Sequence, residues 1–401
     1  MKQKVRLPKL LDYQKELYDA FANDDIFYIT FLKSRQSGGS YFNKWIVTYI
    51  ILTQEKKKIG YCTPTTKLGR LFYTELCKSL EPFILSTNAS ELNITFKSGC
   101  TLQFISSEQK ESVRGFQFHY TVIDEAAFQN ETFLQTILKP TWTILGQKVI
   151  LCSTPNGNSG FFYDHVQMGL NKTNRYFTKV ISIYDNPFIT EEVINEIKKT
   201  IPEKVFKQEY LGEFLDGSGT VFTNFKNCIN ENPSLTGKYY AAIDWAKQSD
   251  YTVLTIINDL KQVVFIYRVT GLDYTIQVKK IVEHLNQWKP IMTISEENNI
   301  GSVINEMLKE QYSGQIKQVW LDNGLKKENI EKLIVAFEQK EIGIPNDDSL
   351  LRELAAFTCI YNPQNGNVKY TAPNGLHDDM VISLSYAFSL VKTKSGNYNI
   401  R

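Results

Sequence analysis

The residues with the clearest potential for chemistry form a short loop between an expected strand and an expected helix. The loop consists of Lys33, Ser34, Arg35, Gln36, Ser37, Gly38, Gly39 and Ser40. Backbone N–H groups in such a loop, together with the N-terminus of the following helix, can bind phosphate oxygens. In the pattern G-x-x-x-x-G-K-[ST], Gly38 and Ser40 match, whereas Lys33 replaces the first glycine and Gly39 replaces the lysine. An ordinary polar loop with tight turns explains this segment equally well.

Two consecutive carboxylates follow the apolar segment Tyr120–Asp124. Asp124 ends the apolar run, and Glu125 comes directly after it. This arrangement is typical of a Walker B strand, in which the first carboxylate holds Mg²⁺ and the second orients and deprotonates the attacking water. A capped helix start is the alternative, but it accounts for only one of the two carboxylates. Together with the loop, the pair predicts a site for ATP and Mg²⁺.

Two other segments are compatible with a nucleotide site. The stretch Cys152–Gly157 ends an apolar run with hydroxyl groups and a turn, a position from which loss of the γ-phosphate can be sensed. Near the N-terminus, Tyr13 and Gln14 place an aromatic ring beside an amide, a pair able to stack on an adenine and read its edge. Any amphipathic helix can show the same pair, so this second signal has low specificity.

The second half of the chain carries three acidic clusters, each next to an apolar run. In chain order they are Asp244 with Asp250, Glu296 with Glu297, and Asp378 with Asp379 after His377. Carboxylates from separate elements can assemble a two-metal site that clamps the attacking and leaving oxygens of a phosphodiester. Each cluster alone has an ordinary explanation, such as the preference for acidic residues at a helix N-terminus. The three in this order predict a metal-dependent nuclease, with Mg²⁺ or Mn²⁺ as the metal.

The apolar runs that lead to these motifs predict the strands that must position them. In the first half we expect a helix over residues 40–54 and strands at 26–32, 59–63, 101–105, 120–124 and 149–153. Strands separated by helix-length segments imply a mostly parallel sheet with helices on both faces. The ligand site of such a sheet lies beyond the carboxyl ends of the strands.

A break of small residues at 216–220 separates the two halves, and strands are expected again at 239–244, 252–258 and 263–269. The predicted domains are therefore residues 1–215 and 216–401. Two long strands joined at Asn258 and Asp259 predict an antiparallel opening to the second sheet, as in ribonuclease H-like folds. The fold class that we expect is α/β, with a mostly parallel first sheet and a mixed second sheet.

Bulk properties exclude several classes of protein. A chain of 401 residues is long enough for two domains, each with its own core. The longest apolar stretches are far too short to span a membrane, and no secretory signal is visible, so we expect a soluble protein. Six scattered cysteines without a C-x-x-C pair argue against zinc ribbons and disulfide frameworks, which fits a reducing cytoplasm. A net charge of +2 does not by itself indicate nucleic acid.

The order of motifs resembles that of the terminase large subunits of tailed bacteriophages. Tyr-Gln, S-R-Q-x-G-x-S, R-G, D-E-A-A-F and S-T-P-N-G resemble the P-loop ATPase half of this family. D-x5-D, E-N-N-x-G and H-D-D resemble its ribonuclease H-like endonuclease half. The resemblance implies a protein of the host cytoplasm that hydrolyses ATP to move double-stranded viral DNA into a procapsid and cuts the DNA concatemer. It also implies a ring of copies on the portal protein and a terminase small subunit as partner.

The resemblance also implies roles for individual residues. In this family the loop lysine can stand at the front of the loop, so Lys33 becomes the expected phosphate contact, with Arg35 as the alternative. Arg114 resembles the arginine that acts as a finger on the nucleotide of a neighbouring subunit. The implied metal ligands are Asp244, Glu297 and Asp379, supported by Asp250, Asp378 and His377. Glu296 remains an alternative to Glu297, and Asp378 an alternative to Asp379, because adjacent residues point in different directions.

Two other functional interpretations compete with this one. A helicase-like ATPase with an accessory nuclease would ordinarily need a second motor domain, whereas here the second half carries the acidic clusters. A degenerate, DNA-binding relative without catalysis is favoured only by Gly39. The carboxylates at 124, 125 and in the three clusters all argue for an active enzyme.

Overall fold

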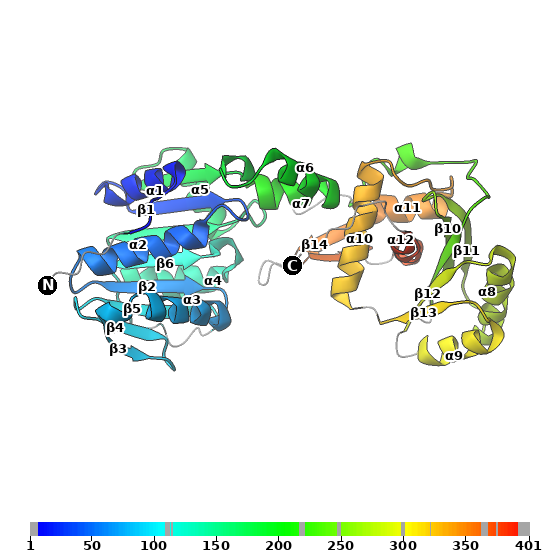
Figure 1. Ribbon diagram of the computed structural model, residues 1–401, viewed down its shortest axis with the longest axis horizontal. Coiled ribbons are helices and arrows are strands. Elements are labelled where there is room, and N and C mark those ends of the chain that lie inside the picture. The colour runs from blue at the N-terminus through cyan, green and yellow to red at the C-terminus, as the bar shows by residue number, and fades with distance from the viewer. Residues whose placement is uncertain are drawn as a thin grey trace. The chain divides into compact units, whose positions relative to one another are not determined.

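The computed structural model describes residues 7–108, 113, 115–215, 221–246, 250–297, 301–320, 322–361, 368–373 and 376–391. By its contacts the chain divides into two compact units (Figure 1). The first unit contains Met1–Glu196 and Lys204–Asp216, and the second contains Ile197–Glu203, Gly217–Tyr361 and Val368–Arg401. The small-residue break expected at 216–220 lies outside the described residues. Each unit has a sheet and a hydrophobic core of its own.

The first unit is built on an eight-stranded sheet with the order β3-β4-β5-β2-β6-β7-β1-β8. The strands are β1 Tyr28–Lys33, β2 Lys58–Thr63, β3 Ile84–Asn88, β4 Asn93–Phe96, β5 Thr101–Ser106, β6 Tyr120–Asp124, β7 Lys148–Ser153 and β8 Tyr176–Ile181. The pairings among β5, β2, β6, β7, β1 and β8 are parallel, whereas β3 and β4 form an antiparallel hairpin at one edge. The mostly parallel sheet expected from the sequence is thereby confirmed.

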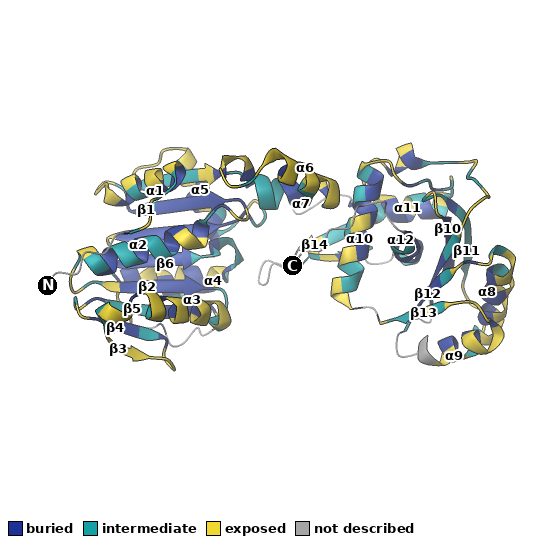
Figure 2. Ribbon diagram, in the orientation of Figure 1, coloured by how far each residue is buried: buried dark blue, intermediate teal, exposed yellow. Residues whose placement is uncertain are grey.

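Helices cover both faces of this sheet, and the central strands β1, β2, β5, β6 and β7 contribute side chains to both. On β7, Ile150 and Cys152 belong to the core shared with the helices α1, α2 and α3, whereas Val149 and Leu151 face the opposite core. This alternation is the period of two of a strand, and it explains why strands buried on both faces are apolar throughout. Figure 2 shows these strands buried along most of their length. The helices are α1 Asp12–Ala22, α2 Gly39–Thr53, α3 Thr66–Ser79, α4 Glu131–Phe133, α5 Phe161–Leu170, α6 Glu191–Thr200 and α7 Glu203–Phe206.

The second unit is built on a five-stranded mixed sheet with the order β11-β10-β9-β12-β13. Its strands are β9 Tyr239–Asp244, β10 Thr252–Asn258, β11 Val263–Val269, β12 Met292–Glu296 and β13 Ile316–Val319. Strands β9, β10 and β11 pair antiparallel, and β9, β12 and β13 pair parallel. This arrangement confirms both the antiparallel opening and the mixed sheet. A separate hairpin consists of β14 Thr358–Tyr361 and β15 Val368–Thr371.

Two groups of helices enclose the second sheet. Ala242 and Ile294 face the core formed with α10, α11 and α12, whereas Ala241 and Ile243 face the core formed with α8 and α9. These helices are α8 Tyr274–Trp288, α9 Gly301–Gln311, α10 Asn323–Glu338, α11 Asp348–Ala356 and α12 Asp379–Leu390. The side of the sheet to which a residue on β9 or β12 points therefore decides which helices it meets. In the described part of the chain, no helix combines the length and the hydropathy that a membrane crossing requires.

Candidate active sites

The first candidate site lies where three neighbouring parallel strands end. Strands β6, β7 and β1 finish at Asp124, Ser153 and Lys33. Because parallel strands share a carboxyl edge, these side chains and the adjoining Glu125 come close together. Lys33 Nζ donates a hydrogen bond to Glu125 Oε1 at 2.9 Å, and Ser153 Oγ lies 3.5 Å from Glu125 Oε2. The structure thus brings the front of the loop and the acidic pair into one site.

The side chain of Lys33 passes directly over the backbone of Gly39. A Cβ atom added to Gly39 would lie 2.3 Å from Lys33 Cδ and 2.8 Å from Lys33 Cε. These distances are far below van der Waals contact, so no side chain fits at position 39 while Lys33 keeps its place. The two departures from the usual pattern therefore depend on each other. Lys33 can take its path only because position 39 is a glycine.

Asp124 is half-buried and is held by two donors. Asn43 Nδ2 on α2 donates to Asp124 Oδ1 at 3.1 Å, and the Tyr61 hydroxyl on β2 donates to Asp124 Oδ2 at 2.8 Å. Burial, and secondarily the neighbouring charge of Glu125, raise the pKa of Asp124 to about 6. Asn43 Oδ1 is also buried and has no hydrogen-bond partner among the described residues. An anionic group that is this costly to ionise gains from a cation, so the surroundings fit a magnesium ligand.

Sequence reasoning missed both residues that hold Asp124. Tyr61 sits in an apolar strand and looks like an ordinary core residue until β2 and β6 are known to be neighbours. Asn43 did carry a signal, because it is a buried polar residue on a helix whose other buried positions are almost all apolar. A buried amide of that kind requires a hydrogen-bond partner, and the partner here is the carboxylate.

The turn after β6 directs Glu125 into the site. Glu125 has a φ of 47°, in the left-handed region that a residue with a side chain rarely adopts. Its position is supported on the far side by the motif after β7, because Asn156 Nδ2 donates to the carbonyl of Ala127 at 2.8 Å. Strain of this kind is commonly found where a side chain must be aimed at a reacting group. The segment Cys152–Gly157 is thus joined to the acidic pair by Ser153 and Asn156.

The phosphate-binding loop is braced by the first helix. Tyr13 donates from its hydroxyl to the carbonyl of Ser37 at 2.9 Å, and Gln14 Nε2 donates to the carbonyl of Gly38 at 3.2 Å. Gln14 Oε1 in turn accepts from the Leu11 N–H at 3.0 Å, and the residue is only 1% exposed. In this arrangement the amide supports the loop. The expected contact of Gln14 with an adenine stays a prediction.

The other loop residues differ in orientation. Arg35 is tied to Glu209 by an ion pair of 2.6 Å between Nε and Oε2, and its side chain is 63% exposed. Ser34 and Ser37 are buried, and Ser37 Oγ donates to the Ser34 carbonyl at 2.7 Å, which closes the turn. The Gln36 carbonyl accepts from Asn186 at 2.7 Å, whereas Ser40 is exposed on the first turn of α2. The geometry therefore favours Lys33 over Arg35 as the residue that contacts the phosphates. The other arginine expected to act on a nucleotide, Arg114, lies outside the described residues.

The second candidate site is formed where β9 and β12 end beside α12. Asp244 ends β9, and Glu296 ends the neighbouring parallel strand β12. Burial, a hydrogen bond with Glu296 and the charges of Glu296, Asp379 and Asp378 all raise the pKa of Asp244 well above its ordinary value. Asp379 is the first residue of α12. Buried carboxylates in such a group repel one another, so a divalent cation between them would relieve both repulsion and burial.

Of the two alternatives at the end of β12, Glu296 and not Glu297 faces α12. Alternate residues of a strand point to the same face, and Ile294, two positions before Glu296, packs in the core that includes α12. Ala242, two positions before Asp244, packs in that same core. Glu296 and Asp244 therefore both point toward α12. Glu297 lies beyond the end of β12, and its N–H donates to the Val319 carbonyl at 2.9 Å.

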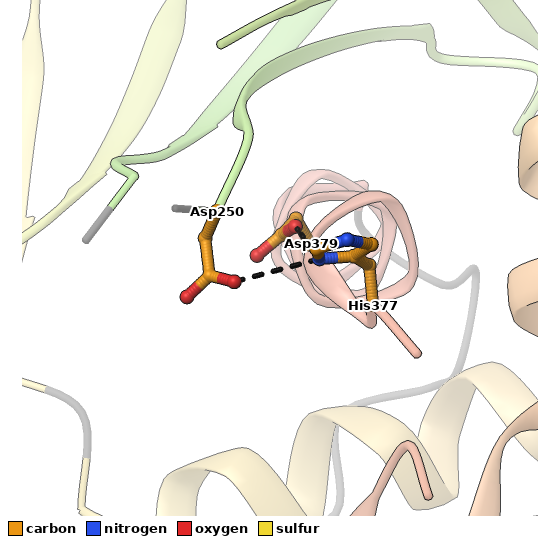
Figure 3. A group of neighbouring side chains, drawn as sticks. All are labelled: Asp250, His377 and Asp379. Atoms are coloured by element: carbon orange, nitrogen blue, oxygen red, sulfur yellow. Dashed lines mark ion pairs between the residues drawn. The ribbon is translucent and has the colours of Figure 1, made fainter. Parts of the chain in front are cut away.

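Three side chains converge beside this group, as Figure 3 shows. His377 Nδ1 lies 3.4 Å from Asp250 Oδ1 and 3.7 Å from Asp379 Oδ2. One ligand atom from each of the three residues falls within 4.8 Å of the others, a spacing compatible with a shared metal ion. Burial raises the pKa of Asp379 to about 6, and the charges of Asp250 and Asp378 act in the same direction. The supporting residues Asp250 and His377 thus lie beside Asp379.

Asp378 and Asp379 have different partners. Asp378 Oδ2 accepts from Lys326 Nζ on α10 at 3.1 Å. Asp379 Oδ2 accepts from the Tyr251 N–H at 3.3 Å and lies on the side of Asp250 and His377. Of the two alternatives at the start of α12, Asp379 is the one that joins the cluster of three, and Asp378 is partly neutralised by a lysine.

Comparison with known sequences points to one family. Residues 30–227 match the family described as terminase large subunit, T4likevirus-type, N-terminal. The chain is 24% identical over 318 residues to the terminase large subunit of Thermus virus P23-45, covering 73% of this chain and 65% of that relative. It is 25% identical over 217 residues to the terminase large subunit of Escherichia phage T5, covering 52% of this chain and 49% of the relative. The matched region thus spans less than two thirds of the length of each relative.

Comparison with solved structures supports the same fold over nearly the whole chain. The large terminase of a thermophilic bacteriophage aligns with a TM-score of 0.58 at 15% identity, covering 95% of this chain and 98% of that chain. The complex of that protein with ATP-gamma-S aligns with a TM-score of 0.55 at 16% identity, covering 94% of this chain and 97% of the other. Fold and motifs define a two-unit α/β protein with a phosphate-binding loop and a carboxylate site. Over residues 30–227, just under half of its length, the chain is similar to the terminase large subunits.

We expect Asp124→Asn to stabilise the metal-free protein in a pH-dependent way. The pKa of Asp124 is raised from 3.8 to about 6, so the folded state disfavours ionisation and loses stability as the pH rises between these values. Removing the charge should raise the free energy of unfolding by roughly 2 kcal/mol more at pH 8 than at pH 4.5. Urea unfolding with a chelator present measures both. An equal effect at the two pH values would show that the pKa of Asp124 is not raised in the folded protein.

Proposed function

We propose that the chain is a DNA-packaging enzyme that hydrolyses ATP at the first site and cuts DNA at the second. Residues 1–215 would form the ATPase domain and residues 216–401 the endonuclease domain. The observation that carries the proposal is the path of Lys33 over Gly39 to Glu125, which supplies a cation to a loop that lacks its usual lysine. Similarity to the terminase large subunits over residues 30–227 and the similar phage protein solved with ATP-gamma-S support the same function.

In the ATPase, the loop residues and the strand ends divide the work. Backbone N–H groups of the loop and the N-terminus of α2 would bind the phosphates, and Lys33 would contact the β- and γ-phosphates. Asp124 and the hydroxyl of Ser40 would hold Mg²⁺, which neutralises the charge of the phosphate oxygens. Glu125 would accept a proton from the attacking water. Asn43 and Tyr61 keep the Asp124 carboxylate in one orientation.

The ion pair of Lys33 with Glu125 gives this site a resting arrangement. While Lys33 Nζ lies 2.9 Å from Glu125 Oε1, that carboxylate oxygen is occupied by the ion pair. A triphosphate carries more negative charge than one carboxylate and would attract the lysine. The move would free Glu125 to orient water only when a nucleotide is bound. Ser153 and Asn156 connect the same place to the turn after β7, through which the state of the site can reach neighbouring segments.

In the nuclease, carboxylates from separate elements would hold two divalent cations. Asp244, Glu296 and Asp379 would bind the first, and Asp379 with Asp250 and His377 would bind the second. Two Mg²⁺ or Mn²⁺ ions would stabilise the attacking and leaving oxygens of the phosphodiester. Lys326, which pairs with Asp378, places a positive charge beside this site, where a DNA phosphate would be attracted.

The partners of the chain follow from the family and not from any surface described above. We propose that the protein acts on double-stranded DNA in the host cytoplasm, bound as a ring of copies to the portal protein of a procapsid. A terminase small subunit would assist in choosing the DNA. In such a ring, Arg114 would act on the nucleotide of the neighbouring copy.

We expect Gly39→Ala to reduce ATP hydrolysis by roughly 10²-fold or more, because the new methyl group displaces Lys33 from the phosphates. The added Cβ would also lie 2.8 Å from Cys152 Sγ, so the variant should be tested with and without Cys152→Ala. Steady-state phosphate release measures activity, and Lys44→Ala, on the same helix, serves as the control. If Cys152→Ala restores Gly39→Ala to full activity, displacement of Lys33 is not the cause.

We expect Glu296→Gln to reduce cleavage of plasmid DNA by roughly 10²-fold in Mn²⁺, because a neutral amide cannot balance the charge of the metal. Glu297→Gln is the matched control and should cleave within a few-fold of the unchanged protein. ATP hydrolysis, measured on the same samples, should be unaffected in both variants. Loss of cleavage in Glu297→Gln with normal cleavage in Glu296→Gln would show that Glu297, and not Glu296, is the metal ligand.

A further inference from the structure

The first turn of α12 lacks the cap that its sequence would be expected to supply. Asp378 stands at the N-cap position, yet its side chain makes no capping hydrogen bond, because it pairs with Lys326 at 3.1 Å. The backbone N–H groups at the start of a helix have no partners within the helix and must find them elsewhere. Asp379, one residue further on, is likewise turned toward Asp250 and His377. Neither aspartate side chain therefore caps the N-terminus of α12.

A glutamate from another helix caps the N-terminus of α12 instead. Glu353 on α11 accepts hydrogen bonds at Oε2 from the N–H of Met380 at 2.8 Å and from the N–H of Val381 at 3.3 Å. The residue is 6% exposed, and its two acceptor bonds lie in the interior of the unit. A carboxylate at this place also interacts favourably with the helix dipole. Glu353 thus fixes the backbone directly after the two aspartates.

The other oxygen of Glu353 connects it to the opposite side of the carboxylate cluster. Arg268 on β11 donates to Glu353 Oε1 at 3.2 Å, and its guanidinium lies 3.6 Å from the centre of the Tyr251 ring. The Tyr251 N–H donates to Asp379 Oδ2 at 3.3 Å. The Tyr251 ring also packs edge-on against His377, with ring centres 5.0 Å apart. Glu353 therefore reaches the candidate metal ligands by two routes, one through α12 and one through Arg268 and Tyr251.

We propose that Glu353 is a positioning residue of the nuclease site. By capping α12 from outside, it leaves the Asp379 carboxylate free to face the cations, while Asp378 pairs with Lys326. With Arg268 it also fixes the Tyr251 backbone that orients Asp379. The proposal rests on the metal-dependent nuclease function proposed above. Partners one contact removed from a metal ligand typically change metal affinity or activity by roughly 10- to 100-fold when mutated.

The substitution Glu353→Gln tests this role with little change of shape. Glutamine has a single acceptor oxygen, so it cannot accept from the α12 backbone and from Arg268 at the same time. We expect the Mn²⁺ concentration for half-maximal DNA cleavage to rise by roughly tenfold. Calorimetric titration of the full chain with Mn²⁺ should show the same weakening without DNA. Amide hydrogen exchange at Met380 and Val381 should become faster in Glu353→Ala, because that substitution removes their acceptor.

A matched control separates positioning from general support of the fold. Asp347 is the N-cap residue of α11 and accepts a hydrogen bond from the Leu350 N–H at 2.9 Å. It lies on the same helix as Glu353, more than one turn before it. Asp347→Ala should lower the melting temperature while the Mn²⁺ concentration for half-maximal cleavage stays unchanged. If Glu353→Gln and Glu353→Ala behave in the same way as Asp347→Ala, the positioning role is overturned. If the unchanged protein itself neither binds Mn²⁺ nor cuts DNA, the proposed nuclease function fails, and this inference fails with it.

Discussion

Both sites are governed by the cost of burying carboxylates at the carboxyl ends of neighbouring strands. At the first site the chain supplies its own compensation, because Lys33 Nζ lies 2.9 Å from Glu125 and two neutral donors hold Asp124. At the second site Asp244 and Glu296 adjoin each other, and burial and repulsion raise the pKa of Asp244. An isolated buried charge is expensive in a medium of low dielectric constant, so each group must recruit a cation or keep a proton. Nucleotide-bound and metal-bound states are the natural ways to meet this requirement.

The same requirement explains why residues outside the motifs matter. Tyr61 and Asn43 orient Asp124 without touching any expected ligand, and Glu353 caps α12 so that Asp379 is free. In each case a neighbouring side chain makes the hydrogen bonds that leave the aspartate carboxylate in one orientation. A motif supplies the reactive groups, whereas these neighbours decide in which direction the groups point.

Much of the fold could be predicted from the sequence because buried parallel strands are apolar throughout and end at recognisable polar turns. The run ending at Asp124 and the run ending at Asp244 were expected with the bounds that β6 and β9 have. That Glu296 faces α12 could also have been predicted, because its spacing from Ile294 determines the face of the strand. Glu353 was not, because α11 carries no sign in its sequence that it meets α12. Contacts between distant elements depend on strand order, which local patterns do not encode.

At the first site the ammonium group of a lysine must reach Glu125 and the phosphates. The position in the chain that carries this lysine is of secondary importance. Exchanging the two residues in Lys33→Gly with Gly39→Lys places the lysine at the usual position of such loops. The exchange is best made with Cys152→Ala, because Cys152 Sγ crowds any Cβ at position 39. We expect each single substitution to abolish ATP hydrolysis and the exchange to restore it at least about tenfold above either single variant, since the cation returns to the same space. An exchanged protein no more active than Lys33→Gly alone would show that the place of attachment, and not the cation itself, is what the site requires.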